Sequence, residues 1–114
     1  MSEVCRFYTI EHPFTAVERG WRGHQIEQRW FFASEGSFTV KIVKINDWTT
    51  PDPKLPQVEF LLSDQQPDIL HVPKGYATLL KANEINSKLL IFADRKIEEA
   101  SLDNYLYDTT YFNS

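Results

Sequence analysis

Residues 22–32 bring together side chains that can hold an anion and move a proton beside it. They include Arg22, His24, Glu27 and Arg29. Histidine, with an ordinary pKa of about 6.5, is the natural base for removing a proton next to a ketone. Guanidinium groups bind phosphate oxygens as a planar fork. The segment therefore predicts a site for an anionic ligand, with His24 as the base and Arg22, Glu27 and Arg29 as binding residues.

These residues also have a simpler interpretation. Arg22 and Arg29 could be surface arginines that pair with Glu18 or Glu27. His24 could be a solvated loop histidine, and its titration range alone does not separate this from a catalytic role. Both interpretations stay open at the level of the sequence.

Arg29 falls within a predicted strand rich in aromatic residues. Side chains alternate along a strand, so if Trp30 and Phe32 lie on one side, Glu27, Arg29 and Phe31 lie on the other. In a small barrel this second side would be the interior. A charged pair there needs a ligand or a mutual partner to offset its desolvation.

The rest of the chain reads as short strands and turns. Glu35 and Gly36 predict a turn that joins the first two strands into a hairpin, and three prolines within 47–56 predict a loop. Helical signal is confined to a short turn at 96–104, and the aromatic tail 105–112 is expected to dock on the barrel. Together they predict an all-β sandwich or barrel of short antiparallel strands. The predicted strands cover 28–33, 37–45, 58–62, 69–72, 77–82 and 88–93.

A second motif, Pro73-Lys74-Gly75, lies between two of these strands. Proline presets φ and glycine accepts the positive φ that a tight turn requires. Lys74 in this turn is a further candidate binding residue. His71, on the strand before the turn, is expected to be a wall residue without a catalytic role.

Length, composition and charge restrict the class of protein. A chain of 114 residues with 42% apolar residues predicts a single folded domain, 1–114. The single cysteine excludes an internal disulfide, and no apolar run reaches the length of a membrane span, so the cytoplasm is the expected location. A net charge of −4 argues against a nucleic-acid partner.

The two motifs resemble the cupin-fold enzymes that act on nucleotide-activated 4-keto sugars. These are the dTDP-4-dehydrorhamnose 3,5-epimerases and the dTDP-sugar 3,4-ketoisomerases, including WxcM-like proteins. The chain is similar to them in its Arg22-Gly23-His24 start, the strand and glycine turn that follow, and the later Pro73-Lys74-Gly75 segment. The resemblance implies a jelly-roll barrel, a homodimer, a nucleotide-sugar substrate and proton transfer without a cofactor. It also implies that Arg22 contacts the diphosphate and that His24 is the base.

The chain departs from both enzyme patterns. The ketoisomerases have two histidines after Arg-Gly where this chain has one, and the epimerases have a tyrosine acid on a late strand where residues 89–94 have none. Tyr76 is the candidate replacement for that acid. Since a 3,5-epimerase performs two inversions, the missing tyrosine favours a 3,4-ketoisomerase. For His24 and Arg29 to share one site on a regular strand, a bulge is expected near Gly23.

The metal-binding cupins are similar to one another in a further set of histidines. Here Ile26 occupies the position of the second histidine of their His-x-His pair, and Thr78 that of the histidine after the Pro-x-Gly turn. His24 and Glu27 alone make too few ligands, so no metal is expected.

Two other functions remain open. The chain could be a non-catalytic cupin that binds a sugar nucleotide or a partner enzyme. It could also be a structural homodimer module whose interface is formed by Trp21, Trp30 and Trp48.

Overall fold

The computed structural model describes residues 6–12, 15, 18–66, 68–94, 103 and 105–112. Within these ranges all regular structure is β, and no helix is long and apolar enough to cross a membrane. The predicted helical turn at 96–104 lies outside the described residues, except for Asp103, which lies in a bend. The strands are β1 Arg6–His12, β2 Glu18–His24, β3 Arg29–Glu35, β4 Ser37–Lys44, β5 Gln57–Ser63, β6 Leu70–Val72, β7 Tyr76–Ala82, β8 Ser87–Ala93 and β9 Tyr105–Leu106.

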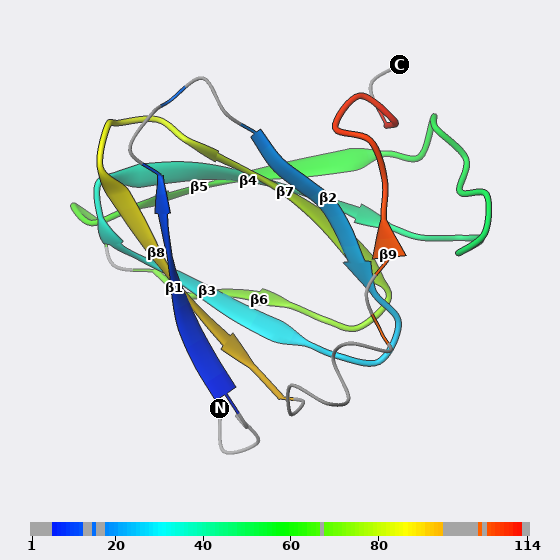
Figure 1. Cartoon of the computed structure of the whole chain (residues 1–114), viewed down its shortest axis with the longest axis horizontal. Coiled ribbons are helices and arrows are strands. Elements are labelled where there is room, and N and C mark those ends of the chain that lie inside the picture. The colour runs from blue at the N-terminus through cyan, green and yellow to red at the C-terminus, as the bar shows by residue number, and fades with distance from the viewer. Residues whose placement is uncertain are drawn as a thin grey trace.

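The strands form two antiparallel sheets that face each other (Figure 1). One sheet has the order β1-β8-β3-β6 and the other the order β5-β4-β7-β2-β9. This arrangement confirms the predicted all-β class with short antiparallel strands. All six predicted strands are present to within a few residues, while β1, β2 and β9 were not predicted as strands.

The predicted hairpin of β3 and β4 is wrong. Gly36 does provide the turn between them, with a φ of +71°, but β3 pairs with β6 and β8 whereas β4 pairs with β5 and β7. The turn therefore carries the chain from one sheet to the other. An alternating pattern shows that each strand buries one face, but it does not show which strand lies beside it.

A hydrophobic core fills the space between the two sheets. Side chains of alternate residues point into it, as the period of a strand requires. On β3 these are Phe31 and Ala33, and on β4 they are Phe38, Val40 and Ile42. These side chains fill one part of the space between the two sheets. The charged residues lie in the adjacent part.

A second core lies on the outer face of the five-stranded sheet. Trp21 of β2 packs edge-on against Phe112, with ring centroids 5.0 Å apart, and both side chains are buried. The backbone of Trp21 also exchanges two hydrogen bonds with Tyr107. The aromatic tail is therefore docked, as predicted. Trp21 is a core residue here, so the predicted three-tryptophan interface is wrong for this residue.

Candidate functional site

The charged residues of the 22–32 segment lie where the chain passes from one sheet to the other. His24 ends β2 in the five-stranded sheet, and Arg29 begins β3 in the four-stranded sheet. Side chains alternate between the two faces only within one strand. Because His24 and Arg29 belong to different strands, both side chains can point to the same site. The bulge expected near Gly23 is instead found between Arg19 and Arg22.

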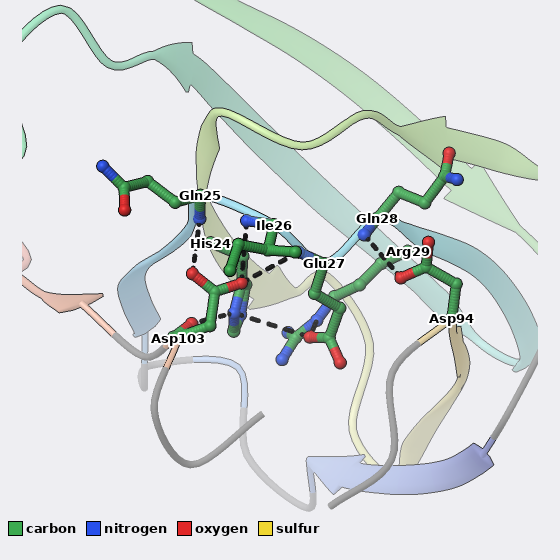
Figure 2. Close-up of polar contacts among 8 residues, drawn as sticks. All are labelled: His24, Gln25, Ile26, Glu27, Gln28, Arg29, Asp94 and Asp103. Carbon is green, nitrogen blue, oxygen red and sulfur yellow. Dashed lines mark hydrogen bonds and ion pairs between the residues drawn. The ribbon is translucent and has the colours of Figure 1, made fainter. Parts of the chain in front are cut away.

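His24, Glu27 and Arg29 form a buried polar chain (Figure 2). The Arg29 Nε donates to the Glu27 Oε2 over 2.9 Å, and the His24 Nδ1 lies 3.5 Å from the same oxygen. The exposed fractions of the three residues are 5%, 1% and 6%. The expectation that Arg29 and Phe31 share the interior face is confirmed, and Glu27 is buried just before β3 begins. The alternative of a surface ion pair between Glu27 and Arg29 is wrong. The buried arginine has the mutual partner that burial demands.

Asp103 holds this chain in place from 76 or more residues away in the sequence. Its carboxylate accepts hydrogen bonds from the backbone amides of Gln25, Ile26 and Glu27 at 2.8, 2.9 and 2.8 Å. Its backbone carbonyl lies 2.7 Å from the His24 Nδ1. Sequence reasoning missed Asp103, since no motif surrounds it and only the fold brings it to the β2–β3 connection.

These contacts decide the protonation state of His24. A carbonyl oxygen can only accept, so Nδ1 donates to Asp103, and Nε2 of the neutral ring is left with its lone pair. Nε2 is buried and has no hydrogen-bond partner among the residues that the structure describes. Burial, followed by the positive charge of Arg29, lowers the pKa of His24 to about 4. The ring is therefore a neutral base at pH 7.

A cavity of about 130 Å³ lies beside this chain, between the two sheets. Arg29 belongs to its wall and connects it to Glu27, whereas His24 and Glu27 do not line it. Burial and the neighbouring charge of Arg29 lower the pKa of Arg22. The structure thus brings Arg22 and Arg29 to one basic cavity next to His24. The lining residues are Tyr8, Ile10, Arg19, Gly20, Arg22, Arg29, Thr78, Leu80, Ile91 and Leu106.

The other two predicted site residues come from the Pro73-Lys74-Gly75 turn. The turn is confirmed, with a φ of +92° at Gly75, whose amide donates to the His24 carbonyl over 2.7 Å. Tyr76 lies directly opposite His24 in the β2–β7 pairing and packs against the inner core, so the two side chains share a face. Lys74 is exposed and does not line the cavity.

Two further predictions concern histidine and metal. His71 is exposed on β6, stacks on Trp30 at 5.1 Å and hydrogen-bonds Gln28 over 2.7 Å, which agrees with a wall residue. In the described part of the chain no three His, Cys, Asp or Glu side chains converge in a way that could hold a metal ion. The metal-free site stays a prediction.

The fold is similar to that of several proteins of known structure. No family model and no curated protein matches the sequence. An rmlC epimerase from Mycobacterium tuberculosis is similar in structure, with a TM-score of 0.81 and 18% identity over 98% of this chain and 56% of that chain. QdtA, a sugar 3,4-ketoisomerase from Thermoanaerobacterium thermosaccharolyticum in complex with TDP, has a TM-score of 0.71 and 18% identity over 96% and 72%.

The capsular polysaccharide assembling protein CapF from Staphylococcus aureus is similar as well, with a TM-score of 0.74 and 13% identity. The match covers 91% of this chain and 27% of CapF. This chain thus spans about half of the epimerase and about a quarter of CapF. At these identities the likeness establishes the fold, and the expected cupin-type architecture is confirmed.

Proposed function

We propose that the protein is an isomerase or epimerase that acts on a nucleotide-activated 4-keto-6-deoxy sugar by proton transfer next to the ketone. One observation carries the proposal: a neutral histidine, whose Nε2 has no partner in the described part of the chain, lies beside a cavity whose wall contains guanidinium groups. A base and a cationic enolate stabiliser are the two groups that this chemistry requires. The shared fold with an epimerase and a 3,4-ketoisomerase supports the same reaction class.

In the 3,4-ketoisomerase form of the reaction, Nε2 of His24 removes the proton from C3 of the sugar. The electron pair moves to the C4 oxygen, where Arg22 or Arg29 stabilises the negative charge of the enolate. Tyr76, which lies opposite His24 in the strand pairing, acts as the acid in this proposal. Return of a proton to C4 and loss of the hydroxyl proton at C3 moves the ketone from C4 to C3. Return to the opposite face of C3 would instead invert that carbon.

Binding of the substrate is expected to raise the pKa of His24 and so to make it a stronger base. The positive charge of Arg29 is the second cause of the lowered pKa of His24. A diphosphate beside Arg22 and Arg29 opposes that charge and so raises the pKa of His24 toward the neutral range, where a general base is most effective. Lys74, exposed in the turn after β6, is assigned to the part of the nucleotide that stays outside the cavity.

The test is incubation with dTDP-4-keto-6-deoxyglucose in heavy water, followed by NMR of the sugar protons. Deuterium at C3 together with a new keto-sugar product is the expected result. The His24→Asn variant should lose exchange and turnover but keep its affinity for dTDP. Turnover retained in this variant would remove His24 from the mechanism.

A second candidate is a cupin that binds a sugar nucleotide without performing chemistry. A specific observation favours it: Nε2 of His24 is buried and His24 does not line the cavity. Binding of dTDP by calorimetry with no deuterium exchange at any sugar carbon would support this candidate over the enzyme.

A homodimer located in the cytoplasm belongs to the same proposal and rests on the resemblance. Analytical ultracentrifugation tests the dimer through the mass of the particle. A single species of 13.4 kDa at micromolar concentration would contradict it.

A further inference from the structure

Glu27 is a buried carboxylate that the proposed mechanism does not use. Its side chain has no exposed surface, and it is not part of the cavity wall between the two sheets. A ligand in that cavity would meet Arg29 and not Glu27, so the predicted role of Glu27 as a binding residue does not fit its position. Because burial of a charge is costly, the place of this carboxylate calls for another explanation.

The carboxylate lies between the candidate base and the cavity wall (Figure 2). Its Oε2 accepts a hydrogen bond from the Nε of Arg29 over 2.9 Å, and the same oxygen lies 3.5 Å from the Nδ1 of His24. Arg29 in turn lines the cavity. One oxygen of Glu27 thus faces the positive charge of the wall on one side and the ring of the base on the other.

The backbone on both sides of this carboxylate is fixed by two aspartates. The amide of Glu27 donates to the Oδ2 of Asp103 over 2.8 Å, and the amide of Gln28 donates to the Oδ1 of Asp94 over 2.9 Å. Figure 2 shows these two carboxylates on either side of residues 25–28. A buried side chain on a fixed backbone needs no reordering when charge develops beside it, which is the condition for effective electrostatic support.

Among the described residues, three charged groups act on His24. They are Arg29 at the start of β3, Glu27 just before it, and Asp103. Asp103 meets the ring through its backbone carbonyl, while its carboxylate is taken up by the amides of residues 25–27. Burial, followed by the charge of Arg29, lowers the pKa of His24 to about 4, and Glu27 is the largest of the causes that oppose this fall. The uncharged Tyr76 lies opposite in the pairing with β7.

The reaction proposed above creates a positive charge next to Glu27. When Nε2 of His24 takes the proton from the sugar, Nδ1 keeps its own proton and the ring becomes an imidazolium. The carboxylate of Glu27 stays ionised and takes no proton itself, as in other histidine–carboxylate pairs. Without it, the new charge would be buried beside the like charge of Arg29, which disfavours protonation of the ring.

We infer that Glu27 is a positioning residue, which acts through His24 by stabilising the protonated form of its ring. The role of His24 as the base rests on the proposed function, whereas the effect of Glu27 on the ring does not. Arg29 has two roles in this arrangement. Its guanidinium group faces the cavity, and its ion pair with Glu27 offsets the cost of burying a carboxylate beside the base.

The test is the NMR titration of His24 in the full chain labelled with ¹³C-histidine, with Glu27→Gln compared to the wild type. Glutamine has the size of glutamate, and its carbonyl oxygen can still accept from the Nε of Arg29, so the variant removes the charge and keeps the contact. Glu35→Gln is the matched control. It removes the same charge from the exposed far end of β3, about 20 Å from Arg29 at roughly 3.4 Å per residue.

At pH 4 about half of His24 should be protonated in the wild type and in Glu35→Gln. In Glu27→Gln the fraction should be about a tenth or less, because the loss of a facing charge lowers the pKa of the ring by about one unit or more. The affinity for dTDP, measured by calorimetry, should not weaken, since Glu27 is not in the cavity wall.

Kinetics on the keto sugar give a second readout. In Glu27→Gln the plateau of kcat should fall about threefold or more, because the base is weaker, and the acid limb of kcat/KM should move to lower pH. A merely structural role of Glu27 would lower the plateau and leave the limb in place.

Two results would overturn the inference. One is an equal titration of His24 in the wild type and in Glu27→Gln. The other is a loss of dTDP affinity of about tenfold in Glu27→Gln, which would return Glu27 to ligand binding. If Glu27→Gln does not fold, Glu27→Asp decides: it draws the charge back by about 1.5 Å, and an unchanged titration of His24 would refute the role.

The titration requires no catalysis, so it separates this inference from the proposed function. Absence of deuterium exchange in the wild type refutes the proposed function. A lowered pKa of His24 in Glu27→Gln would still establish the effect of Glu27 on the ring.

Discussion

Replacement of Asp103 by alanine is expected to lower the free energy of unfolding by about 3 kcal/mol. The side chain is 2% exposed, and its carboxylate accepts three backbone hydrogen bonds from residues 25–27. The substitution removes the two oxygens that accept all three hydrogen bonds and leaves the three amides without this partner. It does so at the connection that joins the two sheets beside His24.

The magnitude follows from the surroundings of each amide. Glu27 is buried, so its amide pays most of the cost of an unsatisfied buried donor, about 2 kcal/mol. Gln25 and Ile26 are exposed, so water can replace the carboxylate and each loses only about 0.5 kcal/mol. Together these losses give the expected value of about 3 kcal/mol.

The assay is urea denaturation followed by tryptophan fluorescence. With a dependence of about 2 kcal/mol per molar urea, the midpoint should fall by about 1.5 M. Asp108→Ala is the matched control, because the Asp108 carboxylate accepts two bonds from Thr110 in an exposed turn. It should lose less than about 1 kcal/mol. Equal losses in the two variants would refute the reasoning that the buried amide decides the cost.

Three further predictions follow from the buried groups. As the pH falls from about 6.5 to about 4, the wild type should lose up to about 3 kcal/mol relative to His24→Gln, because burial lowers the pKa of His24 to about 4 and the unfolded chain binds the proton first. Urea titrations of both proteins at each pH measure this difference, and parallel curves would contradict it. Gly36→Ala should cost about 2–4 kcal/mol, since φ is +71° and the new Cβ would lie 2.9 Å from the Cβ of Ser87; an unchanged melting temperature would disprove the overlap. Phe112→Ala should cost about 3 kcal/mol and shift the fluorescence of Trp21 to the red, and an unshifted spectrum would show that the tail does not cover this ring.

Local patterns predicted six of the nine strands and the side chains that share one face of β3. Alternation along a strand depends only on neighbouring residues, so it placed Arg29 and Phe31 on one face of the strand before any partner was known. The same is true of the turn at Gly75, whose proline and glycine act within three residues. The histidine and arginines of 22–32 were predicted to form a site because of their side-chain types. An imidazole can act as a base and a guanidinium group can bind an anion wherever they lie in a fold.

Pairing between strands could not be read in this way. The turn at Gly36 joins strands of different sheets, and the sequence on either side of it is equally compatible with a hairpin. The bulge that places Arg19 beside Arg22 depends on how β2 is paired with β7, although a glycine inside a strand is a known sign of a bulge.

The sequence by itself determined the all-β class, the face of β3 that Arg29 shares with Phe31 and the chemical types in the site. Only the tertiary structure decided which groups act together, because the contact of Asp103 with His24 joins residues 79 positions apart. The protonation state of His24 is likewise a tertiary property. It results from a carbonyl that fixes the tautomer and from the burial and charge that lower its pKa, and none of these is present in the unfolded chain.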